Sequence, residues 1–386
     1  MNITFFIGNG FDIGLGLKTK YTDFYHEYCS DTANDDENIA SFKSLLKEWQ
    51  RLNQETQDER LKRKIEDWAD FEKAFGEHSS DDAIKDGVSY AARFEDFVTK
   101  FNLYLENEEK NVDYSDADSI AKVMKSGVTS YHHIRRADRL RIEQRYNQIG
   151  GQRTYNFITF NYTRTIDRCA NILKNSIKSE TGRTVGNIVH IHGYVDENMI
   201  MGVNDISQIT NEKFANDPTV SGEIVKPTQN AECRTNYESE AIPIIDSSNI
   251  ICIYGMSLGD TDKKWWQHIF RWLSGDNGRY LVILTHSDKY NKKLPFTQTK
   301  VTNEIVGRFL SFSNSSDEIK NRVANQIFVG VNYDVFAMKL RKPDVVKSEE
   351  TKEEKIANAV ALAAKHSDEI ATATKLAEKA RELVTK

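Results

Sequence analysis

The sequence predicts an α/β fold in which a parallel, Rossmann-like sheet is covered by helices on both faces. Its strands are predicted from six short runs rich in Ile, Val, Phe and Tyr, at residues 1–9, 154–163, 185–193, 249–258, 279–287 and 326–332. Apolar residues follow one another in these runs instead of alternating with polar ones, which is typical of strands buried on both faces. From residue 154 onward the runs alternate with helical patterns, as parallel βαβ units require.

A large helical insertion is predicted at residues 21–150, between the first strand and the rest of the sheet. This stretch has almost no strand-like runs, and segments such as FKSLLKEWQRL and YAARFEDFVTKFNLYLE have helical spacing. The insertion would either form one wall of a pocket or serve as a scaffold or oligomer surface. The α/β core is then expected to comprise residues 1–20 and 151–342.

Two further segments stand out by composition. Residues 204–245 are polar and contain Pro218 and Pro227, so we interpret them as a long loop, of the kind that often forms a lid. After Pro343 the chain is rich in Ala, Glu and Lys and has no Gly, which predicts a C-terminal helical extension over residues 343–386. Apolar residues recur there every seven positions, so the extension is either a homo-oligomer seam or an exposed terminal helix.

Composition excludes several classes of function. The 386 residues are 39% hydrophobic and 28% charged, as in a globular protein, and the net charge of -6 disfavours nucleic acid as a general partner. A local basic segment, HHIRRADRLRIEQR, leaves that alternative open. No apolar stretch is long enough to span a membrane, and the N-terminus lacks the features of a signal peptide, so we expect a cytoplasmic protein. The four cysteines are far apart, which predicts neither a zinc site nor disulfides.

The first motif that could carry chemistry follows the first strand. Gly8, Gly10 and Gly14 form a G-x-G-x-x-x-G pattern, one residue longer than the dinucleotide fingerprint. Glycines at this point let a ligand phosphate approach backbone N–H groups, although a purely structural turn has the same requirement. Asp12 follows the turn and is either a catalytic carboxylate or a cap of the next helix.

Two polar motifs follow later strands. Asn161 ends the second run, where its amide could orient a ribose hydroxyl or a water, or cap the following helix. His190 and His192 share one face of the third run, but no third ligand is evident, so no metal site is predicted. His192 is expected to border the crevice above the sheet, whereas His190 is interpreted as a buried core histidine.

The fourth motif is Y-G-M-S-L-G-D-T-D at residues 254–262. Ser257 and the glycine backbone offer hydrogen-bond donors to a phosphate or ribose, while Asp260 or its neighbours could cap the helix KKWWQHIFRWL. Ser257 lacks the G-x-S-x-G spacing, which argues against a hydrolase nucleophile elbow.

Taken together, these motifs give the chain a family resemblance. IGNGFDIGLGLKTKYTDF, WADFEKAFG, FITFNYT, HIHG, MGVND and IYGMSLGDTD resemble the phage abortive-infection family AbiH over about residues 1–335. AbiH proteins are in turn similar to the sirtuin-like (SIR2) domains of bacterial anti-phage NAD hydrolases. The resemblance implies that Asn161 binds ribose and that His192 is the catalytic base. It departs from the sirtuin pattern at Asn9, where sirtuins have a small residue, and in lacking their four-cysteine zinc module.

The resemblance implies an anti-phage effector that hydrolyses NAD to nicotinamide and ADP-ribose, with NAD as substrate and no other cofactor. The catalytic candidates are His192, Asn161 and Asp12. The residues expected to contact NAD are Gly8, Asn9, Gly10, Phe11, Gly255, Ser257 and Asp260. Such an enzyme must be silent before infection, so a phage-derived trigger is an expected partner. The alternatives are a non-catalytic nucleotide sensor and a nuclease-type effector, the latter disfavoured because no carboxylate cluster for two metals is evident.

Overall fold

The computed structural model describes residues 1–55, 71–81, 84–129, 134–235, 237–333 and 335–343. The chain divides into two compact units, Met1–Arg341 and Lys342–Lys386. The helices predicted after Pro343 lie outside the described residues. Within the part of the chain that is described, no helix has the length and apolar character needed to cross a membrane.

The predicted parallel sheet is confirmed. Its six strands are β1 (Asn2–Ile7), β2 (Arg153–Thr159), β3 (Arg183–His190), β4 (Ile250–Tyr254), β5 (Tyr280–Thr285) and β6 (Ile327–Val331). They lie in the order β3-β2-β1-β4-β5-β6, and every neighbouring pair is parallel. The chain builds β2 and β3 on one side of β1 and then crosses to β4 on the other. Ligands of open α/β sheets bind at such a reversal, beyond the carboxyl ends of the strands.

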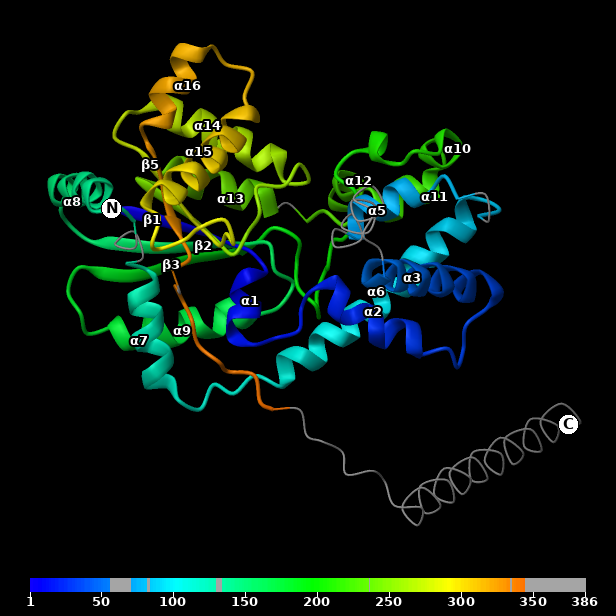
Figure 1. The fold of residues 1–386 in the computed structure, drawn as a ribbon. Coiled ribbons are helices and arrows are strands. Elements are labelled where there is room, and N and C mark those ends of the chain that lie inside the picture. The colour runs from blue at the N-terminus through cyan, green and yellow to red at the C-terminus, as the bar shows by residue number, and fades with distance from the viewer. Residues whose placement is uncertain (56–70, 82–83, 130–133, 236, 334, 344–386) are drawn as a thin grey trace, which may run out of the picture. The chain divides into compact units, whose positions relative to one another are not determined.

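Helices cover both faces of the sheet, as the continuous apolar runs predict (Figure 1). The neighbouring side chains of Phe5 and Phe6 are both fully buried but belong to different hydrophobic clusters, one on each face. The Phe5 face is covered by α1 (Gly10–Leu15), α7 (Ala117–Gly127) and α9 (Thr165–Ile177). The Phe6 face is covered by α13 (Tyr237–Asp246), α14 (Lys263–Gly275), α15 (Pro295–Ser311) and α16 (Asp317–Ala324).

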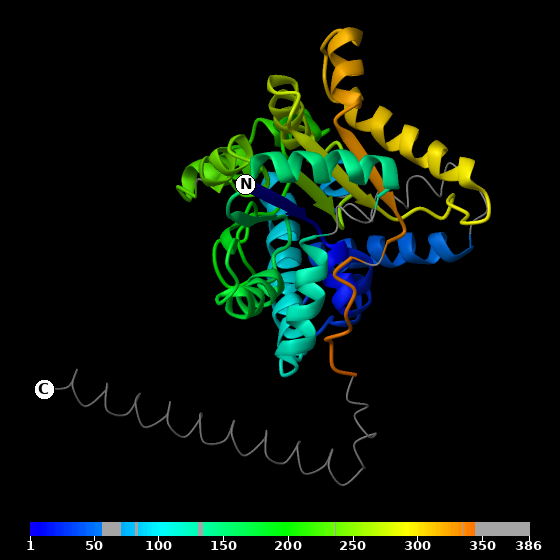
Figure 2. The same cartoon turned by 90° about the vertical axis from the view of Figure 1, so that its left-hand side faces the viewer.

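Residues 21–149 are helical where they are described. Their helices are α2 (Tyr21–Ser30), α3 (Glu37–Glu55), α5 (Phe71–His78), α6 (Gly87–Lys110), α7 and α8 (Arg136–Ile149). The first four share an aromatic core separate from the sheet, in which the rings of Phe71 and Phe97 stack with centroids 3.6 Å apart. In contrast, α8 passes the amino-terminal ends of β5 and β6 (Figure 2). There Arg145 and Arg141 donate to the carbonyls of Gly278 and Asn325.

The prediction of a long loop at residues 204–245 is wrong. This segment folds into η2 (Ile206–Gln208), α10 (Glu212–Ala215), α11 (Pro218–Ile224), α12 (Lys226–Glu232) and most of α13. The side chains of Asp205, Asn211 and Asp217 cap three of these helices by accepting backbone N–H groups. Pro218 and Pro227 lie in the first turns of α11 and α12, where a missing N–H costs nothing because no intrahelical acceptor exists there. The part of the segment from η2 to Val225 packs on the aromatic core of the insertion, whereas α13 packs on the sheet.

Candidate functional site

A cavity of about 340 Å³ lies at the carboxyl edge of the sheet, a volume in the usual range for small-molecule sites. Loops that follow four different strands line it, because parallel strands bring their carboxyl ends to one edge. They contribute Gly8, Asn9 and Asp12 after β1, Asn161 after β2, His192 after β3, and Gly255 and Ser257 after β4. The helical insertion closes another side with Tyr21, Glu72, Phe101 and Leu105, and α12 contributes Lys226.

The glycines after β1 pack two loops against each other. The N–H of Gly8 donates to the carbonyl of Tyr254 at 3.0 Å, and the N–H of Gly10 donates to the carbonyl of Gly255 at 2.8 Å. A Cβ atom on Gly10 would lie 2.5 Å from the Cα of Gly255, so no larger residue fits without movement. The N–H of Phe11 turns back to the carbonyl of Gly8. These three N–H groups are therefore already used within the protein, and the glycines serve the turn itself.

Three of the residues expected to contact NAD have other partners. The Asn9 side chain lines the cavity but is tied to Thr19, both to its hydroxyl and, at 3.0 Å, to its carbonyl. The Phe11 ring is fully buried in the core, and Asp260 forms an ion pair with Arg308 at 3.0 Å. Neither Phe11 nor Asp260 lines the cavity.

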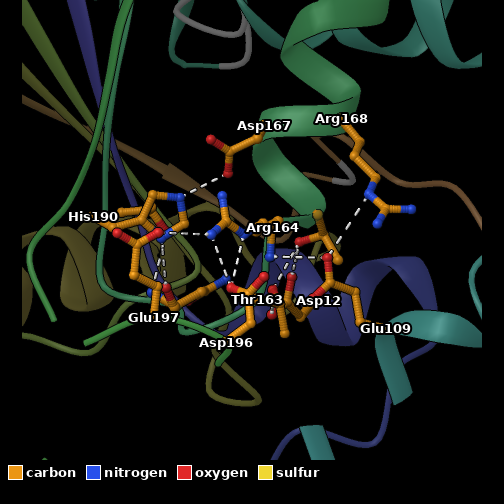
Figure 3. A network of polar contacts seen from close by, with 12 residues as sticks. Asp12, Glu109, Thr163, Arg164, Asp167, Arg168, His190, Asp196 and Glu197 are labelled. Atoms are coloured by element: carbon orange, nitrogen blue, oxygen red, sulfur yellow. Dashed lines mark hydrogen bonds and ion pairs between the residues drawn. The ribbon is translucent and has the colours of Figure 1, made fainter. Parts of the chain in front are cut away.

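Asp12 is a buried carboxylate beneath the cavity (Figure 3). It lies inside α1 and does not cap it, because its oxygens accept the hydroxyl protons of Thr163, at 2.7 Å, and of Thr165. Loss of hydration on burial raises the pKa of Asp12 to about 6, and the two hydroxyls oppose that rise. Asp12 thereby anchors the loop after β2 to α1.

Asn161 is held by its backbone while its side-chain amide has a free donor. Its N–H donates to Oγ1 of Thr159 at 3.1 Å, and its carbonyl lies 3.1 Å from Nδ1 of His190. The Nδ2 atom is buried and has no hydrogen-bond partner among the described residues. The amide is nevertheless close enough to Asp12 to lower the pKa of that carboxyl. A buried donor that lines a cavity without a partner is a group available to a ligand.

His192 borders the same cavity, and its ring makes no hydrogen bond to another described residue. It lies against the rings of Phe160 and Tyr162, with centroids 5.5 Å and 6.2 Å away. Burial, and secondarily the positive charge of Lys226, lowers the pKa of His192 well below its ordinary value. The imidazole is therefore neutral near pH 7 and can accept a proton. His190, in contrast, is fully buried and both its ring nitrogens have partners.

Sequence reasoning missed a buried ion pair in the cavity wall. Oε2 of Glu72 lies 2.7 Å from Nζ of Lys226, and Oε1 accepts the N–H of Gly202 at 3.2 Å and the hydroxyl of Tyr162 at 3.3 Å. Glu72 lies within the WADFEKAFG motif, whose first three residues are outside the described ranges. This motif is the signal in the sequence that points to Glu72. Lys226 lies in the segment interpreted as a loop.

Over the described ranges, no group of three or more His, Cys, Asp or Glu side chains could hold a metal ion. The comparison with protein families gives one match. The model of the family described as bacteriophage abortive infection AbiH matches residues 4–284, which includes most of β1, all of β2 to β4 and all the cavity residues named above. No curated protein matches the chain.

Proposed function

The chain belongs to the AbiH family of bacteriophage abortive infection proteins, and we propose that it acts in this process by hydrolysing NAD to nicotinamide and ADP-ribose. The observation that supports the proposal most is that one cavity contains both the buried amide donor of Asn161 and the neutral imidazole of His192, neither of which has a hydrogen-bond partner among the described residues. The two residues are 31 positions apart in the sequence and follow adjacent strands of the sheet.

The reaction needs few groups. The bond between C1′ of the ribose and N1 of the nicotinamide breaks, and its electron pair leaves with the ring nitrogen, which loses its positive charge. The leaving group is neutral, so it needs no general acid. The transition state has oxocarbenium character, and a water oxygen forms the new bond to C1′. One proton of that water must be removed.

His192 is the proposed acceptor of that proton, and Asn161 is proposed to orient the water or a ribose hydroxyl. A neutral imidazole can accept a proton at physiological pH, and general base assistance of this kind is worth roughly 10²- to 10⁴-fold in rate. The lowered pKa of His192 keeps the ring unprotonated but also makes it a weak base. Positioning of the water by Asn161 is therefore expected to matter as much as basicity.

The pyrophosphate and bases of NAD would not be bound as they are by the glycine-rich fingerprint loop of dinucleotide-binding folds. Because the N–H groups of Gly8 and Gly10 are already used, the pyrophosphate needs other donors. Lys20 and Ser257 are exposed and line the cavity, so an ammonium and a hydroxyl are available for this role. The aromatic rings of Tyr21 and Phe101 offer surfaces for a planar base.

The first test is incubation of the purified full chain with NAD while nicotinamide release is followed. His192→Ala and Asn161→Ala should each lower the rate at least about 100-fold. The matched control is His268→Ala, since His268 on α14 is paired with Asp246 of α13 and does not line the cavity. Activity that survives both cavity substitutions would refute the assignment of these residues.

The second test measures NAD in infected cells, where any trigger is present. Cells that express the wild-type chain should lose NAD after phage infection, and cells that express His192→Ala should not. Abortive infection with unchanged NAD would exclude the proposed chemistry. If NAD instead raises the thermal midpoint of the protein without nicotinamide release, the site belongs to a nucleotide sensor.

A further inference from the structure

His190 links the cavity loop to helix α9 through both of its ring nitrogens. Nδ1 lies 3.1 Å from the carbonyl oxygen of Asn161. Nε2 contacts the carboxylate of Asp167 (Figure 3) and lies 2.7 Å from its Oδ2. The ring is fully buried and packs on Tyr194, with centroids 4.1 Å apart. The Arg164 guanidinium in turn lies over the Tyr194 ring, with its Cζ atom 4.0 Å from the ring centroid. The position of the imidazole is thus fixed on several sides.

The chemistry of the two contacts defines the state of the ring. A carbonyl oxygen and a carboxylate oxygen are both acceptors, so each contact is a hydrogen bond only if the facing ring nitrogen carries a proton. Both bonds of His190 are made when Nδ1–H donates to Asn161 and Nε2–H donates to Asp167. The Asp167 carboxylate then fixes the orientation of the ring.

The hydrogen bonds of the Asn161 backbone explain why the position of His190 matters for the cavity. Its Nδ2 atom makes no hydrogen bond to the described residues, so the backbone contacts help to set the direction of the amide beside Asp12. The N–H of Asn161 is held by Thr159 and its carbonyl by His190. Of these two bonds, only the one with His190 comes from another strand. The next residue of the loop, Tyr162, is held from the same side, because its carbonyl accepts the N–H of Val195 at 3.0 Å.

We propose that His190, oriented by Asp167, is a positioning residue that clamps the Asn161 carbonyl and so aims the Asn161 amide at the reacting ribose or water. This inference rests on the proposed NAD hydrolysis for its kinetic effect, but the clamp itself exists without substrate. His190 does not line the cavity and touches no reacting atom.

The kinetic test compares two substitutions of His190 that differ in one donor. In His190→Asn the side-chain amide can place a donor where Nδ1 was, whereas His190→Leu cannot. We expect His190→Leu to lower kcat about 10- to 100-fold, as for a buried carbonyl left without its donor, with little change in KM. His190→Asn should recover most of that loss. Equal losses in the two variants would overturn the clamp, since a merely structural role does not depend on the donor.

The control for local charge is Asp196→Asn. Asp196 accepts from Arg164 at 2.8 Å in the same surface network but does not contact His190, so its substitution should leave kcat unchanged. Should both His190 variants fail to fold, Asp167→Ala replaces them, because the Asp167 side chain is 24% exposed and its loss leaves no buried cavity. It should lower kcat in the same direction, and wild-type kcat in Asp167→Ala would also overturn the role of Asp167.

A second measurement separates this inference from the proposed function. In the full chain with ¹⁵N-labelled histidine, NMR should show protons on both ring nitrogens of His190, and Asp167→Ala should remove the proton at Nε2. A bare Nδ1 in the wild-type protein would overturn the clamp whether or not NAD is cleaved. Two protonated nitrogens in a chain that leaves NAD unchanged in infected cells would instead leave the clamp in place and refute NAD hydrolysis.

Discussion

The Nζ atom of Lys226 lies 2.7 Å from Oε2 of Glu72, in an ion pair that joins α12 to α5 in the wall of the cavity. Both side chains are buried. The other oxygen of Glu72 accepts the Gly202 N–H and the Tyr162 hydroxyl, so one carboxylate connects the insertion, the loop after β2 and the helical segment after β3. Removal of one partner leaves a buried charge unpaired, which costs far more than loss of an exposed pair.

We therefore expect Glu72→Gln to lower the free energy of unfolding by up to about 3 to 5 kcal/mol. The double variant Glu72→Gln/Lys226→Met should be close to the wild type, because it removes both charges and nearly keeps the volume. Urea unfolding measures the free energy of unfolding of both variants. The matched control is Glu238→Gln, which breaks the exposed pair with Lys264 and should cost less than about 1 kcal/mol. A double variant as unstable as the single one would contradict the explanation.

The close contact between Gly10 and Gly255 gives a second prediction. A Cβ atom on Gly10 meets backbone atoms that cannot rotate away, so Gly10→Ala should destabilise the chain by about 1 to 3 kcal/mol and displace the loop that carries Asn9 and Asp12. The control is Gly307→Ala in α15, where a Cβ atom would meet nothing within 4 Å. It should stabilise the protein by about 0.5 to 1 kcal/mol. Thermal unfolding measures the stability of both variants. A Gly10→Ala variant as stable as the wild type would be inconsistent with the observed packing.

The success of the strand predictions has a local cause. Consecutive apolar residues such as Phe5 and Phe6 must be buried on both faces of a strand, and this requirement is visible in the sequence alone. Strand ends are harder to predict from the sequence. The third apolar run extends to residue 193, but β3 ends at His190. Gly193 has a φ of +70°, and a Cβ atom there would lie 1.9 Å from the carbonyl oxygen of Asn198, so a tight turn ends the run.

The errors come from signals that can be interpreted in two ways or that act over long distances. Pro218 and Pro227 were interpreted as marks of a loop, although proline is equally suited to the first turn of a helix. The partners Glu72 and Lys226 are 154 positions apart, and no local pattern relates them. The common cavity of Asn161 and His192 was predictable because both follow strands of one parallel sheet.

The buried carboxylate of Asp12 predicts a pH dependence of stability. Its pKa is about 6 in the folded protein, against an ordinary value of 3.8. Between these values the folded state binds a proton that the unfolded state has lost, so this group lowers the free energy of unfolding as the pH rises from about 4 to about 6. A pKa difference of this size corresponds to roughly 3 kcal/mol.

The variant Asp12→Asn removes this titration while it keeps the size of the side chain. Urea unfolding of the two proteins at several pH values isolates the contribution of Asp12, because other titrating groups affect both. The stability of the variant relative to the wild type should rise by up to roughly 3 kcal/mol between about pH 4 and pH 7. A difference that stays constant with pH would show that Asp12 is ionised in the folded state throughout this range.

The lowered pKa of His192 can be tested without any enzymatic activity. Burial is the main cause of the lowering, and the positive charge of Lys226 adds to it. In the Glu72→Gln/Lys226→Met variant the second cause is absent, so the pKa of His192 should rise toward its ordinary value of 6.5 but remain below it. NMR titration of the ring proton, assigned by its loss in His192→Asn, measures this directly. If the chain hydrolyses NAD, the acid limb of kcat/KM should move to higher pH in the same variant, because His192 then becomes protonated earlier as the pH falls. An unchanged or lowered pKa of His192 would show that Lys226 does not act on the imidazole across the cavity.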